Sequence, residues 1–201
     1  MLRRVLVAWL AAEPQSRQYR QGLDLLAAPL LAVLLSRRDP NRSGSSVVLE
    51  RRASALLDRV VTRHAGRYFS HGVTADIAFR ASLSTIVRVL RFWDPELALR
   101  VWEMELVPEL FAMPWLVTLF ADTLTLPDTC DAWDLLLPLG PACAAAAAAA
   151  LLCSPAVRGP LLAAASLEDA LVFISALNGG AVAVDVRWVV LRAMVLYAET
   201  P

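Results

Sequence analysis

The stretch LLLPLGPACAAAAAAALLCSPAV, residues 135–157, contains no charged side chain and is long enough to cross a lipid bilayer. Pro138, Gly140, Pro141 and Pro155 interrupt it, however, and leave an unbroken apolar run of only twelve residues, ACAAAAAAALLC. A run of this length is too short to span a membrane, and alanine inserts weakly into bilayers. The stretch therefore predicts a helix buried in the core of a folded domain and no transmembrane segment.

The charge balance of the chain limits its partners. The 201 residues carry 19 basic and 19 acidic side chains, so the formal net charge is zero. Because nucleic-acid binding needs a surplus of positive charge on one face, we expect no nucleic-acid partner.

Cysteines and histidines are few and scattered. Cys130, Cys143 and Cys153 include no Cys-x-x-Cys pair, which argues against a zinc site or a disulfide framework and fits a reducing compartment. His64 and His71 lie seven residues apart without a carboxylate pattern, so we interpret them as ordinary surface or groove histidines and not as ligands. We therefore predict no metal site and no cofactor.

Apolar residues at helical spacing predict an all-α fold with eight or more helices and no strand. Asp94, Ser166 and Asp185 stand where they would begin helices, and Thr74 is a fourth candidate cap. The absence of an internal repeat disfavours a solenoid, and the helices are too many and too unequal for a four-helix bundle. The predicted helices cover residues 2–12, 22–35, 47–68, 74–92, a segment from 95, short segments divided by Pro108, Pro114 and Pro127, then 166–177 and 186–198.

One loop interrupts this pattern. The stretch SRRDPNRSGSS, residues 36–46, is rich in turn-forming and charged residues, so we predict a flexible loop there. The length of the chain, residues 1–201, fits one domain with its own core or a large piece of a bigger domain.

Two segments carry motifs that resemble a known family. QYRQGLDLLAAPLL, residues 18–31, resembles the Tyr-x-Gln-Gly motif of the TBC domain, the Rab GTPase-activating module. WEMELVPELFAMPWLVTLFADTLTLPDTCDAWDLLL, residues 102–137, is similar to the family's Pro-x-Leu-(Phe/Tyr)-Ala-x-Pro-Trp stretch and to the Thr-x-Phe, Leu-Pro and Trp-Asp elements that follow it. LEDALVFISAL (167–177) and LRAMVLYAETP (191–201) resemble the closing helices of the branch in which a TBC domain accompanies a kinase-like region. The matching residues of the second segment are Pro108, Leu110, Phe111, Ala112, Pro114, Trp115, Thr118, Phe120, Leu126, Pro127, Trp133 and Asp134.

This resemblance implies an irregular multi-helix fold and a role in GTP hydrolysis. Hydrolysis needs an oriented attacking water and positive charge against the transferring phosphoryl group, and the family supplies both in trans. Gln21 matches the family's glutamine, whose amide both accepts and donates hydrogen bonds. Tyr19, Arg20 and Gly22 would bind the partner, with Tyr19 packing to hold the loop and Gly22 allowing a close backbone approach.

The chain departs from the family's pattern at the arginine finger. That arginine lies in an Ile-x-x-Asp-x-x-Arg motif some tens of residues before Tyr-x-Gln-Gly, whereas only 18 residues precede Tyr19. Arg3 and Arg4 fall in the helix between the two motifs, where a solvated helix face is the expectation. No arginine of this chain is assigned the finger role. The chain is expected to cover roughly the C-terminal two-thirds of a TBC domain, as a fragment or as a shortened protein.

Two function hypotheses remain at this point. In the first, the chain helps a Rab-type small GTPase, bound to GTP and to its own magnesium, to hydrolyse GTP; it is then not a self-contained enzyme. In the second, it is an inactive TBC-like helical module that binds a GTPase or another partner as a scaffold. An Ile-x-x-Asp-x-x-Arg motif in frame upstream would favour the first hypothesis. The expected location is the cytoplasm, including the cytosolic face of endomembranes, which the chain would reach peripherally through the Rab.

Overall fold

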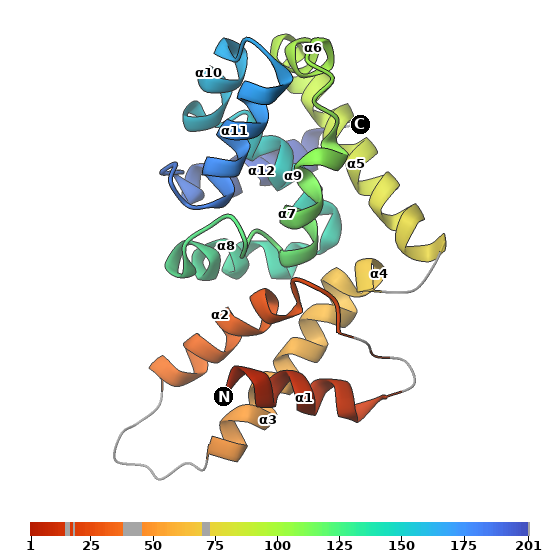
Figure 1. Cartoon of the computed structure of the whole chain (residues 1–201), viewed down its shortest axis with the longest axis vertical. Coiled ribbons are helices and arrows are strands. Elements are labelled where there is room, and N and C mark those ends of the chain that lie inside the picture. The colour runs from red at the N-terminus through yellow and green to blue at the C-terminus, as the bar shows by residue number, and fades with distance from the viewer. Residues whose placement is uncertain (15–16, 18, 38–45, 70–72, 201) are drawn as a thin grey trace.

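The computed structural model describes residues 1–14, 17, 19–37, 46–69 and 73–200 (Figure 1). The side chains of residues 67 and 73–75 lie outside this description. The loop predicted at 36–46 falls almost wholly on residues 38–45, which are not described, so its flexibility stays a prediction.

The described residues form helices and turns only, arranged as two lobes (Figure 1). The all-α prediction is confirmed. The N-terminal lobe contains α1 (Leu2–Ala12), α2 (Leu23–Ser36), α3 (Ser46–Val60), the π-helical turn η1 (Val61–Ala65) and α4 (Gly66–Phe69). The C-terminal lobe contains α5 (Val73–Trp93), α6 (Pro95–Glu103), the 3-10 turn η2 (Pro108–Leu110), α7 (Ala112–Thr118), α8 (Leu126–Leu139), α9 (Pro141–Leu152), α10 (Pro155–Ala163), α11 (Leu167–Asn178) and α12 (Val186–Glu199).

The alanine-rich helix α9 lies at the centre of the C-terminal lobe. Every residue from Cys143 to Leu152 is buried, which confirms the predicted core helix. α5, α7, α8 and α12 all pack against it. Alanine side chains let these neighbours approach the α9 backbone closely, and alanine also has the highest helix propensity.

Taken singly, the apolar helices differ in length or composition from membrane-spanning helices. Among the described residues, no single helix combines the length and apolarity that crossing would require. α9 and α10 together reach that length and composition, but their axes are bent by 60° at the break between them.

Three helix starts confirm the caps read from the sequence. The Asp94, Ser166 and Asp185 side chains accept hydrogen bonds from the backbone N–H groups of Leu97, Asp169 and Trp188, at 3.1, 3.2 and 2.9 Å. Each bond satisfies a donor that the first turn of a helix leaves free, which explains why these local signals are reliable.

Other predicted boundaries are wrong. α5 begins at Val73, so Thr74 lies inside the helix and is not its cap. Pro114 does not separate two helices. It lies in the first turn of α7, where a backbone N–H has no intrahelical acceptor and its loss costs little.

The helix predicted over 47–68 is not one continuous α-helix, because η1 widens it by one π-helical turn. Gly66 accommodates this turn, since a Cβ at that position would lie 2.9 Å from the Val61 carbonyl oxygen. His64 lies in η1 and is only 5% exposed, so its interpretation as a surface or groove histidine is wrong. Burial lowers the pKa of His64, and the neighbouring Arg63 charge adds to this shift. His71 lies outside the described residues.

An arginine of α10 holds the start of α6. The Arg158 guanidinium donates to both carboxylate oxygens of Asp94, at 2.6 and 3.1 Å, and to Glu96 at 2.5 Å. Partial burial alone would raise the pKa of Asp94, but the hydrogen bonds from Arg158 and from the Leu97 N–H outweigh it and lower that pKa. Asp94 therefore serves as a helix cap and as an ion-pair partner.

We expect Ala147→Leu to destabilise the fold, because Ala147 is 1% exposed inside α9 and a larger side chain would push its neighbours apart. The free energy of unfolding should fall by about 1–3 kcal/mol, as for other overpacked cores. Urea titration followed by circular dichroism measures this loss. The matched change Ala11→Leu, on the exposed face of α1, should have almost no effect. If Ala147→Leu and Ala11→Leu had the same free energy of unfolding, the central position of α9 in the core would be contradicted.

We expect Asp94→Asn to lower the melting temperature at pH 7, because the amide keeps an oxygen for the cap but loses the charge that faces Arg158. A carboxylate whose folded pKa is depressed stabilises the fold above its unfolded pKa, near 4, and this contribution is lost as the pH falls through the folded pKa. The two melting temperatures should therefore converge toward pH 2. A pH-independent gap would show that the Asp94 charge is unimportant. Asp131→Asn, on the exposed face of α8, controls for loss of a surface carboxylate.

Candidate functional site

Gln21 lies at the corner of a tight turn that leads into α2. The Leu23 N–H donates to the Arg20 carbonyl at 3.2 Å, which closes a four-residue turn over 20–23. Gly22 has φ 98° and ψ −14°, values typical of the third position of a type II turn. α2 therefore begins at Leu23 and not at Gly22, and Gly22 is its left-handed N-cap. This arrangement leaves the Gln21 side chain exposed on the surface.

The backbone of this turn packs directly on α7 of the C-terminal lobe. Gly22 is buried, and a Cβ built on it would lie 3.2 Å from both Val117 Cγ1 and Thr118 Cγ2. A side chain at this position would meet both groups and would also have to adopt a φ that L-residues rarely tolerate. Gly22 thus makes its close backbone contact with α7 of the same chain. A close approach of Gly22 to a partner stays a prediction.

The end of α7 is itself held by several hydrogen bonds. Thr118 Oγ1 donates to the Pro114 carbonyl at 2.8 Å and accepts from the Asp122 N–H at 3.2 Å. Leu119 and Phe120 both have positive φ, 49° and 67°, although neither is glycine. Such strain persists only where the surroundings determine the backbone strongly.

Two tryptophans supply that support. Trp133 Nε1 donates to the Leu119 carbonyl at 2.8 Å, and Trp115 Nε1 donates to Asn178 Oδ1 at 2.7 Å. Both rings are buried, as expected for large aromatic residues with a satisfied N–H. The residues of the second motif therefore brace the surface on which the first motif rests.

The residues beside Gln21 tie the turn to the N-terminal lobe. The Arg20 guanidinium donates to the Tyr68 carbonyl of α4 at 3.3 Å, and the Tyr19 hydroxyl donates to Asp24 of α2 at 3.2 Å. The Asp24 charge raises the pKa of Tyr19, and slight burial and the hydrogen bond to Asp24 raise it further. Tyr19 is 54% exposed, and the contact that holds it to α2 is the hydrogen bond of its hydroxyl; its role in packing the loop stays a prediction.

The arginines near the N-terminus face solvent or carboxylates. Arg3 and Arg4 are both exposed on α1, as expected, and Arg4 pairs with Glu50 at 2.7 Å. Arg17 pairs with Glu13 and Asp58, each at 2.8 Å. None of these contacts involves the Gln21 turn.

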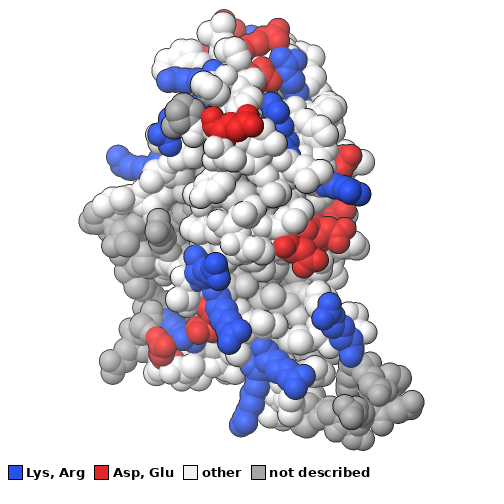
Figure 2. Space-filling model, turned by 180° about the vertical axis from the view of Figure 1, so that it is seen from behind, with Lys and Arg blue, Asp and Glu red and all other residues white. Residues whose placement is uncertain are grey.

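On the face shown in Figure 2, basic and acidic side chains are distributed over the surface, in places next to one another, with broad uncharged surface between the groups. Within the part of the chain that the structure describes, no group of three histidine, cysteine or acidic side chains is placed to hold a metal ion.

The chain is similar to known proteins both in sequence and in fold. The family model described as Rab-GTPase-TBC domain matches residues 1–154. The TBC domain-containing protein kinase-like proteins of Gallus gallus, Mus musculus and Homo sapiens are each 29% identical over 135 residues. These matches cover 67% of this chain but only 13% of each relative, so the chain spans a small part of those proteins. The fold is similar to the crystal structure of the Ypt/Rab-GAP domain of Gyp1p, with a TM-score of 0.76 and 16% sequence identity. The superposed region covers 98% of this chain and 65% of that chain.

We expect Gly22→Ala to lower the free energy of unfolding by roughly 1–3 kcal/mol, from backbone strain and from the contact with α7. Gly180→Ala is the matched control, since Gly180 also has a positive φ, 72°, but has no atom within 4 Å of an added Cβ. Chemical denaturation of both variants separates the contact from the strain. If Gly180→Ala were as destabilising as Gly22→Ala, the packing of the turn on α7 would contribute nothing.

Proposed function

We propose that this chain, which belongs to the Rab-GTPase-TBC domain family, takes part in GTP hydrolysis by a Rab-type small GTPase and supplies Gln21 in trans to the reacting phosphate. The observation that supports this role most directly is that Gln21 is exposed while the residues on either side of it are held in place. Arg20 binds the Tyr68 carbonyl, and Gly22 packs on α7. A side chain that must orient a water molecule gains from a fixed backbone, because misplacement of the reacting groups lowers the rate steeply.

The chemistry of an amide suits this task. The Gln21 carbonyl oxygen would accept a hydrogen bond from the attacking water, while its NH₂ group would donate to a phosphate oxygen or to a backbone carbonyl of the partner. A glutamate at position 21 would only accept hydrogen bonds, and its charge would face the phosphates. The magnesium needed for hydrolysis would belong to the GTP-bound partner.

The flanking residues would hold the turn in place. Arg20 would act mainly through its bond to the Tyr68 carbonyl, and Gly22 through its packing on α7. Tyr19, whose ring is more than half exposed beside Gln21, is the flanking side chain best placed to contact the partner.

Positive charge at the phosphates would have to come from an arginine in addition to Gln21. Arg4 and Arg17 pair with carboxylates and Arg20 binds the Tyr68 carbonyl. We assign the finger role to none of the arginines in residues 1–201. A form of the protein extended upstream, with an Ile-x-x-Asp-x-x-Arg motif, would supply it. Because such a partner is membrane-associated, we further propose that the chain works at the cytosolic face of endomembranes.

The test of this proposal is single-turnover GTP hydrolysis by a panel of Rab-type GTPases. In the extended form, Gln21→Ala should reduce the stimulated rate on the order of 10²-fold, the scale of a group that positions a nucleophile. The melting temperature should hardly change, because Gln21 is exposed. Glu168→Ala, which removes an exposed side chain of α11 outside the turn, is the control and should retain the full stimulation.

Three other results would overturn parts of the proposal. Equal stimulation by the wild type and Gln21→Ala would make Gln21 an ordinary turn residue. Binding of the GTP-loaded partner without stimulation, even by the extended form, would favour the scaffold hypothesis. Strong stimulation by residues 1–201 alone would show that the arginine lies within this chain, and Arg3, Arg4 and Arg20 should then be substituted first.

A further inference from the structure

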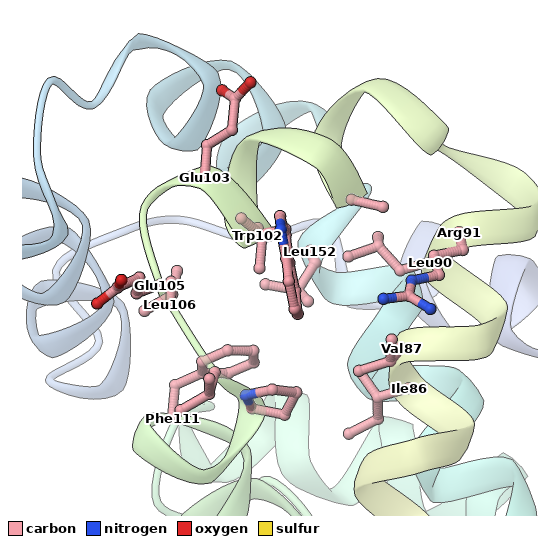
Figure 3. Close-up of a pocket in the computed structure, with 14 residues that line it drawn as sticks. Ile86, Val87, Leu90, Arg91, Trp102, Glu103, Glu105, Leu106, Phe111 and Leu152 are labelled. Atoms are coloured by element: carbon pink, nitrogen blue, oxygen red, sulfur yellow. The ribbon is translucent and has the colours of Figure 1, made fainter.

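A concave site lies in the C-terminal lobe, away from the Gln21 turn. It is a cavity of about 650 Å³ between α5, α6 and the segment 104–111 (Figure 3). Its floor consists of core side chains that are nearly inaccessible, Ile86, Phe111 and Leu152 among them. Trp102 stands at the lip and is 71% exposed. Neither the Gln21 turn nor its α7 contacts line this cavity.

The wall formed after α6 has a fixed backbone. The Leu106 N–H donates to the Val101 carbonyl and the Glu105 N–H to the Trp102 carbonyl, each at 3.0 Å. With Glu105 at φ 56°, these two bonds form a Schellman motif, in which a glycine is usual at the left-handed position. The chain keeps this conformation without glycine, so the cavity is preformed by rigid elements, as ligand pockets usually are.

The charge directed at the cavity is positive. In Figure 3 the Arg91 guanidinium points into the cavity toward Trp102, whereas the carboxylates of Glu103 and Glu105 point away from it. Arg91 Cζ lies 6.0 Å from the centre of the Trp102 ring, within range of a cation–π interaction. Glu103 instead pairs with Arg100 at 3.5 Å. Among the ion pairs of the described residues, none involves Arg91.

We propose that this cavity binds a soluble amphiphilic anion, with an unbranched apolar chain against Trp102 and the core side chains and a carboxylate on Arg91. Water in the liquid occupies about 30 Å³ per molecule, so the cavity offers room for roughly twenty heavy atoms, enough for a ten-carbon carboxylate. A mostly apolar lining with a small number of polar groups is the usual composition of such a site. This proposal is independent of GTP hydrolysis.

Isothermal titration calorimetry of residues 1–201 with decanoate, below its aggregation concentration, tests the proposal. Decyltrimethylammonium is the charge-reversed comparator with the same chain length. We expect one saturable site for decanoate, with a dissociation constant at least tenfold lower than that of the cation. Equal or tighter binding of the cation would mean that Glu103 and Glu105 set the charge of the site, and would overturn the proposal. Absence of saturable decanoate binding would overturn it as well.

Two pairs of variants locate the binding. Arg91→Gln should weaken decanoate binding at least tenfold, whereas Arg88→Gln, an exposed residue one turn earlier on α5 that does not line the cavity, should not. Trp102→Ala should weaken binding, whereas Leu99→Ala, also exposed on α6 and outside the lining, should not. All four side chains are exposed or half-exposed, so the melting temperatures should stay close to that of the wild type. Equal effects within either pair would place binding elsewhere on the surface.

Discussion

A helix that is buried on every side can have close neighbours only when its own side chains are small. α9 meets this condition with seven consecutive alanines, and its neighbours α5, α7, α8 and α12 surround it. Because α7 packs on α9, the burial of α9 also fixes the surface that receives Gly22. The exposed turn that carries Gln21 thus depends on the packing at the centre of the other lobe.

The sequence predicted the features of the fold that local chemistry determines. Asp94, Ser166 and Asp185 cap helices through bonds to N–H groups three residues away, and such short-range bonds need no tertiary information. Features that depend on packing were missed. The π-helical turn around His64 interrupts a regular apolar pattern, and no periodicity distinguishes it from an α-helix. The place of Pro114 was missed for a related reason. A proline can stand in the first turn of a helix as well as between two helices, and α7 begins two residues earlier, at Ala112.

At the candidate site, the resemblance to the family identified the segment that contains Gln21, but it did not identify the contacts that hold this segment in place. Nothing in the spacing of Tyr-x-Gln-Gly shows that Gly22 meets Val117 and Thr118, nearly a hundred residues further along the chain. That contact is tertiary, and it depends on the left-handed φ of Gly22 and on the hydrogen bond that holds Leu119 at the end of α7. The cavity below Trp102 was also missed, since its walls come from three separate segments and the exposure of Trp102 cannot be read from the sequence.

The contact between Gly22 and α7 limits how much the Tyr-x-Gln-Gly motif alone says about a relative of this chain. A relative could keep a glutamine at the position of Gln21 and still present it in the wrong place, if a larger residue stood where Val117 or Thr118 stands here. A search with the short motif alone would not distinguish such a protein from this chain. The informative unit is the pair of segments, because the buried wall of α7 supports the turn that carries the exposed amide.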